Sequence, residues 1–190
     1  MAWTEDVLGT LRRIAEVLDA LDVPWAVGGS FASSMHGEPR STNDIDVIAA
    51  LRLPHVDVIA STLGDRFYLD TTAMERAIVS RQSFNVIDQH SIVKVDVFVP
   101  PRGALGEGQL ARRLRRELPG GGSAYVLSAE DIVLQKLRWY DLGGRSSERQ
   151  WRDLVAVLRA DGLDSDYLSS TAAESGLAAL LSEAFRDASG

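Results

Sequence analysis

Two groups of residues near the start of the chain have the types and spacing that phosphate chemistry requires. Gly28, Gly29 and Ser30 form a small-residue turn, whose backbone N–H groups can approach phosphate oxygens because glycine carries no Cβ. Asp44 and Asp46 follow, separated by one apolar residue, so on a β-strand both carboxylates point to the same face. Two carboxylates on one face can ligate one Mg²⁺ or bridge two. The sequence around them reads as strand, turn, short helix, loop and strand, an order that predicts turn and carboxylates at one end of a sheet.

A third carboxylate, Asp96, lies further along the chain amid the apolar residues of segment 93–99. A charge among apolar neighbours is costly unless it is paired or bound to a metal. Together with Asp44 and Asp46, it suits a site for two Mg²⁺ ions, which clamp the attacking and leaving oxygens of a phosphoryl displacement. Two simpler interpretations stay open: Asp44 and Asp46 as a turn and strand-edge pair, and Asp96 as an ion-pair partner of Lys94 or part of an exposed strand face.

The elements that must position these residues follow from periodicity, caps and breakers. We expect an α/β (α+β) fold, with a small mixed sheet flanked by helices and followed by a helical C-terminal portion. The expected units are residues 1–100, a core with an N-terminal helix, and residues 101–190, a mostly helical portion packed on it. Helices are predicted at 4–21, 31–36, 54–63, 72–79, 105–118, 128–142, 148–160 and 166–188, and strands at 25–27, 45–48, 67–69, 83–87, 91–99 and 125–127.

Composition narrows the class of protein. The 190 residues are 45% hydrophobic and 25% charged, with a net charge of −7 and no cysteine, which excludes disulfides and thiolate metal sites and argues weakly against a general nucleic-acid binder. There is no apolar run of about 18 residues and no signal-peptide pattern, so we expect a cytoplasmic protein with no membrane partner. Two arginine groups are read either as solvated helix faces or as a local polyanion-binding surface: Arg112, Arg113, Arg115 and Arg116, and Arg138, Arg145, Arg149 and Arg152.

The segment 25–99 resembles the nucleotidyltransferase superfamily of the polymerase-β type. Its pattern is a Gly-Ser turn, an Asp-x-Asp pair and a later strand Asp, and here these are Gly29-Ser30, Asp44-Ile45-Asp46 and Asp96. The resemblance implies that Ser30 and the backbone of Gly28 and Gly29 hold phosphates, and that the three aspartates ligate Mg²⁺, with Asp96 also helping to deprotonate an acceptor hydroxyl. It implies transfer of NMP from an NTP to that hydroxyl, with release of pyrophosphate.

The C-terminal half is similar to the AbiEii/MenT branch of that superfamily. The resemblance rests on segments 128–137 (SAEDIVLQKL) and 149–154 (RQWRDL). It implies that Lys136 contacts the triphosphate, that Asp153 belongs to the site, and that the protein is the toxin of a toxin–antitoxin pair, modifying tRNA and neutralised by an antitoxin. The simpler interpretations are a snorkelling surface lysine at Lys136 and a salt bridge from Asp153 to a neighbouring arginine.

Arg40 lies in a run that resembles the Gly-x-x-Arg-x-Thr-x-Asp pattern of the same group. Arg40 is a candidate to contact the phosphates or the acceptor, and an ion pair with Glu38 is the alternative. Two other functions stay open for the whole chain. One is an antibiotic nucleotidyltransferase acting on an aminoglycoside or lincosamide. Many such enzymes have an aspartate in the helix after the Gly-Gly turn, and the presence of Ser33 and Ser34 in that region here counts against this function. The other is a non-catalytic binding module with the same fold.

Overall fold

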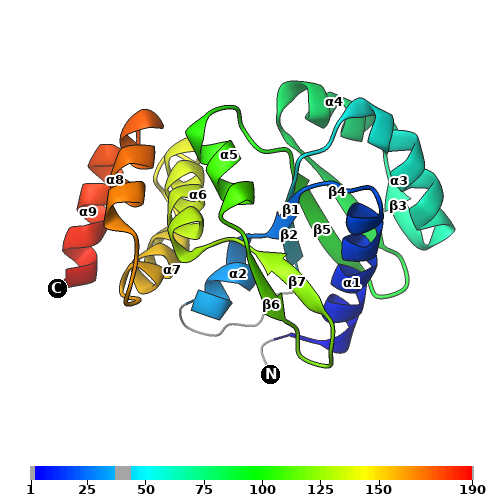
Figure 1. The fold of residues 1–190 in the computed structure, drawn as a ribbon, viewed down its shortest axis with the longest axis horizontal. Helices are drawn as coiled ribbons and strands as arrows, with labels where there is room; N and C mark the ends of the chain where they lie inside the picture. The colour runs from blue at the N-terminus through cyan, green and yellow to red at the C-terminus, as the bar shows by residue number, and fades with distance from the viewer. Residues whose placement is uncertain (1–2, 37–43, 190) are drawn as a thin grey trace.

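The computed structural model describes residues 3–36 and 44–189, and within them a mixed seven-stranded sheet runs through the middle of the molecule (Figure 1). Its order is β3-β4-β5-β2-β1-β7-β6. The central strand β2 lies antiparallel to β1 and parallel to β5, and β1 is parallel to β7. The strands are β1 (Trp25–Val27), β2 (Asp44–Ala49), β3 (Phe67–Leu69), β4 (Ser83–Asp88), β5 (Val93–Phe98), β6 (Leu114–Glu117) and β7 (Ser123–Val126).

Helices cover both faces of this sheet. Figure 1 shows α1, α3 and α4 at one end of the molecule and α7, α8 and α9 at the other, with the strands between them. The helices of the described chain are α1 (Glu5–Ala20), α2 (Gly29–His36), α3 (Val56–Leu63), α4 (Thr71–Ser80), α5 (Ala104–Ala111), α6 (Ala129–Leu142), α7 (Glu148–Leu158), α8 (Ser165–Glu174) and α9 (Ala178–Ser189), with short 3-10 turns at Leu53–His55 and Gly64–Arg66. The predicted α/β class is confirmed.

Strict alternation along β2 and β5 separates the two faces. Ile45 and Val47, together with Val95 and Val97, turn toward α1, α3 and α4, and all four are buried in one hydrophobic cluster. The opposite face carries Asp44, Asp46 and Ile48 on β2 and Lys94, Asp96 and Phe98 on β5, because side chains two residues apart share a face. Ile48 and Phe98 belong to a second cluster, built around α6 and the C-terminal helices. The carboxylates therefore lie on the α6 face.

The helix predicted at 105–118 is wrong in its second half. The helix α5 ends at Ala111, and Leu114–Glu117 form the edge strand β6, paired antiparallel with β7. The connecting turn uses Gly120, Gly121 and Gly122 at positive φ, a conformation that glycine adopts at little cost. Long polar side chains favour a helix only weakly, so hairpin pairing overrides their propensity.

The single helix predicted at 166–188 is also wrong, since the chain forms two helices, α8 and α9. Gly176 lies between them at φ +72°. Its N–H donates to the carbonyl of Ala173, and the Leu177 N–H donates to Ala172, so the last carbonyls of α8 are satisfied by a left-handed cap.

The division of the chain at residue 100 stays a prediction. Strands β6 and β7 come from beyond that point and belong to the same sheet as β1 and β2. Within the described ranges, none of the helices has the length and apolar character needed to cross a membrane.

Candidate active site

The three predicted carboxylates lie on the first residues of β2 and the middle of β5. Asp46 pairs in register with Asp96, and Asp44 pairs with Lys94, in the parallel β2–β5 ladder. Neighbouring strands lie about 4.8 Å apart in a sheet. The register therefore places two carboxylates side by side on the α6 face, and Asp44 continues the row toward the start of β2.

Electrostatics in this row favour a cation. The pKa of Asp46 is raised to about 6, chiefly by burial and then by the carboxylate of Asp96, with a smaller contribution from Asp44, while Lys136 and the Ser30 N–H act to lower it. When a like charge raises the pKa of a carboxylate, a cation bound between the two carboxylates stabilises the ionised form. A bound cation would therefore stabilise the ionised form of Asp46.

Gly29 has to be glycine, because its Cα approaches Asp46 too closely for a side chain. A Cβ on Gly29 would lie 1.7 Å from Oδ2 of Asp46, and the residue has φ +56°. The turn is fastened to β2 by the Gly28 N–H, which donates to the carbonyl of Asp46 at 2.8 Å. The small-residue turn and the Asp-x-Asp pair, 14 to 18 positions apart in the sequence, are in direct contact.

The backbone donors of this turn already have protein partners. Besides the Gly28 N–H, the Gly29 N–H donates to Oε1 of Gln135 at 3.2 Å, and the Ser30 N–H bonds to the Asp46 carboxylate. In this state the turn positions Asp46. The assignment of the Gly28 and Gly29 backbone to phosphates stays a prediction, and it requires these contacts to exchange when a nucleotide binds.

Lys136 and Asp153 come together, as the resemblance implies. The Lys136 side chain, only 4% exposed, places Nζ 3.4 Å from Oδ2 of Asp153 and close enough to Asp46 to lower its pKa. A buried ammonium needs a carboxylate partner, which excludes a snorkelling surface lysine. Lys136 links the helix α6 to β2 and to α7, and its role toward a triphosphate stays a prediction.

A cavity of about 290 Å³ opens beside Ser30, between α2 and α7. Ser30, Ser33 and Ser34 of α2 and Asp153 of α7 line it. Arg149 and Arg152, noted in the sequence only as part of a basic group, also line it. Guanidinium groups next to hydroxyls and a helix start suit the binding of an anion such as a triphosphate.

The alternative for Asp96, an ion pair with Lys94, is present in the structure. Lys94 Nζ lies 2.8 Å from Oδ2 of Asp96, and this hydrogen bond raises the pKa of Lys94. Across the described chain, no three Asp, Glu, His or Cys side chains converge closely enough to hold one metal ion. The donor set nevertheless fits Mg²⁺, which takes carboxylate oxygens, and Lys94 must move aside for Asp96 to serve as a ligand.

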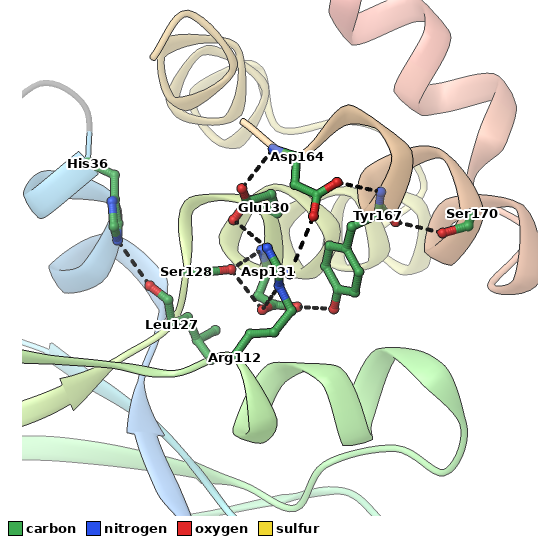
Figure 2. A network of polar contacts seen from close by, with 9 residues as sticks. All are labelled: His36, Arg112, Leu127, Ser128, Glu130, Asp131, Asp164, Tyr167 and Ser170. Atoms are coloured by element: carbon green, nitrogen blue, oxygen red, sulfur yellow. Dashed lines mark hydrogen bonds and ion pairs between the residues drawn. The ribbon is translucent and has the colours of Figure 1, made fainter. Parts of the chain in front are cut away.

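The helix α6 carries both Gln135 and Lys136, and a polar network fixes its first turn (Figure 2). Ser128 caps the helix and also donates to Asp131 at 2.8 Å. The Tyr167 hydroxyl of α8 donates to the same buried carboxylate at 2.7 Å, and Arg112 lies 4.0 Å above the Tyr167 ring. The end of α5, the start of α6 and the helix α8 are thereby joined.

One predicted site residue has no described position, and one residue of the site was not predicted. Arg40 lies outside the described residues. Gln135 was missed, because a lone glutamine in an amphipathic helix carries no signal until the helix is placed against Gly29. Its position next to Lys136 in segment 128–137 is the hint that the sequence contains.

Comparison with solved structures identifies the architecture. The antibiotic-resistance factor ANT(2'')-Ia in solution has a TM-score of 0.52 at 15% identity, with 95% of this chain and 93% of that chain covered. An antigenic nucleotidyltransferase-like protein from Paracoccidioides brasiliensis has a TM-score of 0.50 at 22% identity, covering 97% and 94%. The crystal structure of ANT(2")-Ia with adenylyl-2"-tobramycin gives 0.50 at 16%, covering 96% and 98%. The chain has the nucleotidyltransferase fold.

The nucleotidyltransferase fold is shared over nearly the whole length of these proteins, including the C-terminal helices. Protein-family models and curated proteins both return no match to this sequence. Because a fold carries many functions, the activity has to be argued from the site.

Proposed function

We propose that the protein is a metal-dependent nucleotidyltransferase, which moves NMP from an NTP to an acceptor hydroxyl. The observation that carries this proposal is the contact between the two halves of the site. Gly29, which tolerates no Cβ, lies against Asp46, and Asp46 lies in register with Asp96. A structural role requires neither a paired row of carboxylates nor a turn fitted to it, whereas phosphoryl transfer at a metal requires both.

The proposed reaction forms one bond and breaks one. The acceptor oxygen attacks the α-phosphorus, the bond from that phosphorus to the bridging oxygen breaks, and pyrophosphate leaves with the electron pair. The hydroxyl proton passes to Asp96, the carboxylate in register with Asp46 on the neighbouring strand. Lys136 and the cavity side chains Arg149 and Arg152 neutralise the triphosphate and hold it in line, so positioning and charge stabilisation supply most of the rate.

Asp44, Asp46 and Asp96 would hold the divalent cation, with Mg²⁺ as the ion that their oxygen donors favour. When bound, the cation neutralises charge that develops on the phosphate oxygens. The chain itself orients the ligands: the Ser30 N–H bonds to Asp46, and Lys94 pairs with Asp96.

For the acceptor, we propose tRNA, with the protein acting as the toxin of a toxin–antitoxin pair. The support is the resemblance of segments 128–137 and 149–154 to the AbiEii/MenT branch, together with the meeting of Lys136 and Asp153 across α6 and α7. An antibiotic nucleotidyltransferase is the second candidate, favoured by the fold shared with ANT(2")-Ia, which is seen with adenylyl-2"-tobramycin.

The test measures label transfer. The protein is incubated with each α-labelled NTP and Mg²⁺, with either total tRNA or an aminoglycoside panel as acceptor. We expect label on tRNA, and label on a drug would instead support the second candidate. Asp44→Ala should abolish transfer, and Asp57→Ala, an exposed carboxylate on α3, should retain it. Transfer to no acceptor by the unmodified protein, or equal transfer by Asp44→Ala, contradicts the proposed activity.

A further inference from the structure

A second cavity, of about 150 Å³, lies on the α6 face next to the carboxylate row. Ile48 and Phe98 line it, and each stands two residues beyond a site aspartate, Asp46 or Asp96, on the same strand and face. Two residues of strand span about 7 Å. The cavity therefore borders the Asp46–Asp96 pair on the side of Ile48 and Phe98, whereas the cavity at Ser30 lies between α2 and α7.

One wall of this cavity is aromatic. The Phe98 and Trp139 rings, from β5 and α6, lie with their centroids 4.8 Å apart at an interplanar angle of 37°. A cavity of this size with apolar walls accommodates one aromatic ring, and aromatic faces favour stacking with another flat ring. The volume and the aromatic residues of the lining thus suit a planar group.

The polar part of the wall is positive. Among its described lining residues the charged ones are Arg81 and Arg138, and none is a carboxylate. Neither arginine makes an ion pair with any residue that the structure describes. An arginine left without a carboxylate beside a cavity is available for an anion, and its planar fork matches phosphate.

A buried amide adds a specific contact. Gln109 of α5 lines the cavity and is 3% exposed, so its amide is placed to bond a molecule held there. Buried polar side chains normally have a partner. Gln135 also lines the cavity and contacts the Gly29 N–H, so one side chain joins this cavity to the phosphate turn.

From this arrangement we infer that the cavity is the acceptor pocket, and that it takes a nucleotide unit: a flat ring stacked on Phe98 and Trp139, with its phosphate at Arg138 and Arg81. The inference rests on the proposed nucleotidyl transfer and specifies its acceptor side. A polycationic aminoglycoside is disfavoured, because two arginines repel it and the described wall offers no carboxylate to bind it.

The test measures binding without catalysis, so that it stands apart from the proposed activity. A nucleoside monophosphate is titrated by calorimetry into the full chain without NTP or metal, and compared with its unphosphorylated nucleoside, a five-nucleotide single-stranded RNA and kanamycin. We expect the monophosphate to bind more tightly than the nucleoside, and kanamycin not to bind. If the RNA binds more tightly than the monophosphate, the acceptor is the end of an RNA strand. If the two bind equally, the acceptor is a free nucleotide.

Matched variants locate the bound molecule. Arg138→Gln should weaken monophosphate binding at least about tenfold, while Arg145→Gln, an exposed arginine after the end of the same helix, should leave it unchanged. Gln109→Leu should weaken it as well. Equal binding by Arg138→Gln and the unmodified protein overturns the inference. It is also overturned if Ser30→Ala loses binding while Arg138→Gln keeps it, because the nucleotide would then bind in the cavity beside Ser30.

Kinetics separate the two proposals. If transfer is observed, Arg138→Gln should raise KM for the acceptor with KM for the NTP unchanged, and a rise in KM for the NTP alone overturns the acceptor assignment. If no transfer is observed but the Arg138-dependent binding is, the proposed activity fails and the nucleotide pocket stands.

Discussion

The two faces of the sheet bury polar groups in different ways. On the face packed by α1, α3 and α4, the fully buried carboxylate of Asp88 accepts hydrogen bonds from Thr10 and Arg66, at 2.9 and 2.8 Å, and from a backbone N–H. On the α6 face, burial and the like charge of Asp96 raise the pKa of Asp46. A buried polar group with a full set of hydrogen bonds stabilises the fold, whereas a buried carboxylate next to a like charge indicates a ligand site.

The largest expected effect is a loss of activity that distinguishes two glycines, Gly29 and Gly64, which both have φ +56°. Gly29→Ala adds a Cβ that would lie 1.7 Å from Asp46, whereas Gly64→Ala, on the α3 side, meets nothing within 4 Å. Backbone strain costs both variants about 1–3 kcal/mol of unfolding free energy. We expect Gly29→Ala alone to lose nucleotide transfer, by more than about 100-fold. Circular dichroism and urea unfolding, measured beside activity, provide the check; retained transfer in Gly29→Ala would show that the close approach is not needed.

The next effect concerns the structural face. Burial acts to raise the pKa of Asp88, but hydrogen bonds from Arg66 and Thr10 outweigh it and hold the pKa at about 2. A depressed carboxylate pKa stabilises the folded state above the unfolded pKa of about 3.9, and this contribution is lost as pH falls toward 2. The loss is about 2 kcal/mol. Urea unfolding between pH 5 and pH 2 should show it, and Asp88→Asn should flatten the curve; an unchanged slope in Asp88→Asn rules out this assignment.

A smaller effect is expected at the start of α6. Tyr167→Phe removes the hydroxyl that donates to Asp131, and a hydrogen bond to a charged group contributes about 1.5 kcal/mol. Tyr68→Phe, on the exposed strand β3, is the control and should change stability by less than about 0.5 kcal/mol. Thermal unfolding of the pair measures the difference, and equal melting temperatures would mean that the network in Figure 2 does not hold α6 in place.

The sequence predicted the parts of the site that depend on local order. Gly29 and Asp46 belong to consecutive strand, turn and strand segments. The alternation in 93–99 grouped Asp96 with Lys94 and Phe98, and the register of β2 with β5 then sets Asp96 beside Asp46. The sequence did not predict the hairpin β6–β7, because those residues pair only when the glycine turn folds back. Gln109, Gln135 and Trp139 were missed for a related reason: their meaning depends on how α5 and α6 pack over β5, and helix periodicity does not carry that information.

Binding of a nucleotide that cannot react tests the central claim most directly, because it needs no knowledge of the acceptor. A non-hydrolysable NTP analogue is titrated with and without Mn²⁺ into the unmodified protein, Asp46→Asn and Asp57→Asn, with calorimetry and the Mn²⁺ electron paramagnetic resonance signal as readouts. The account predicts metal-dependent binding in the unmodified protein and in Asp57→Asn, weakened at least about tenfold in Asp46→Asn. Binding that is independent of the metal, or equal in all three proteins, would contradict it.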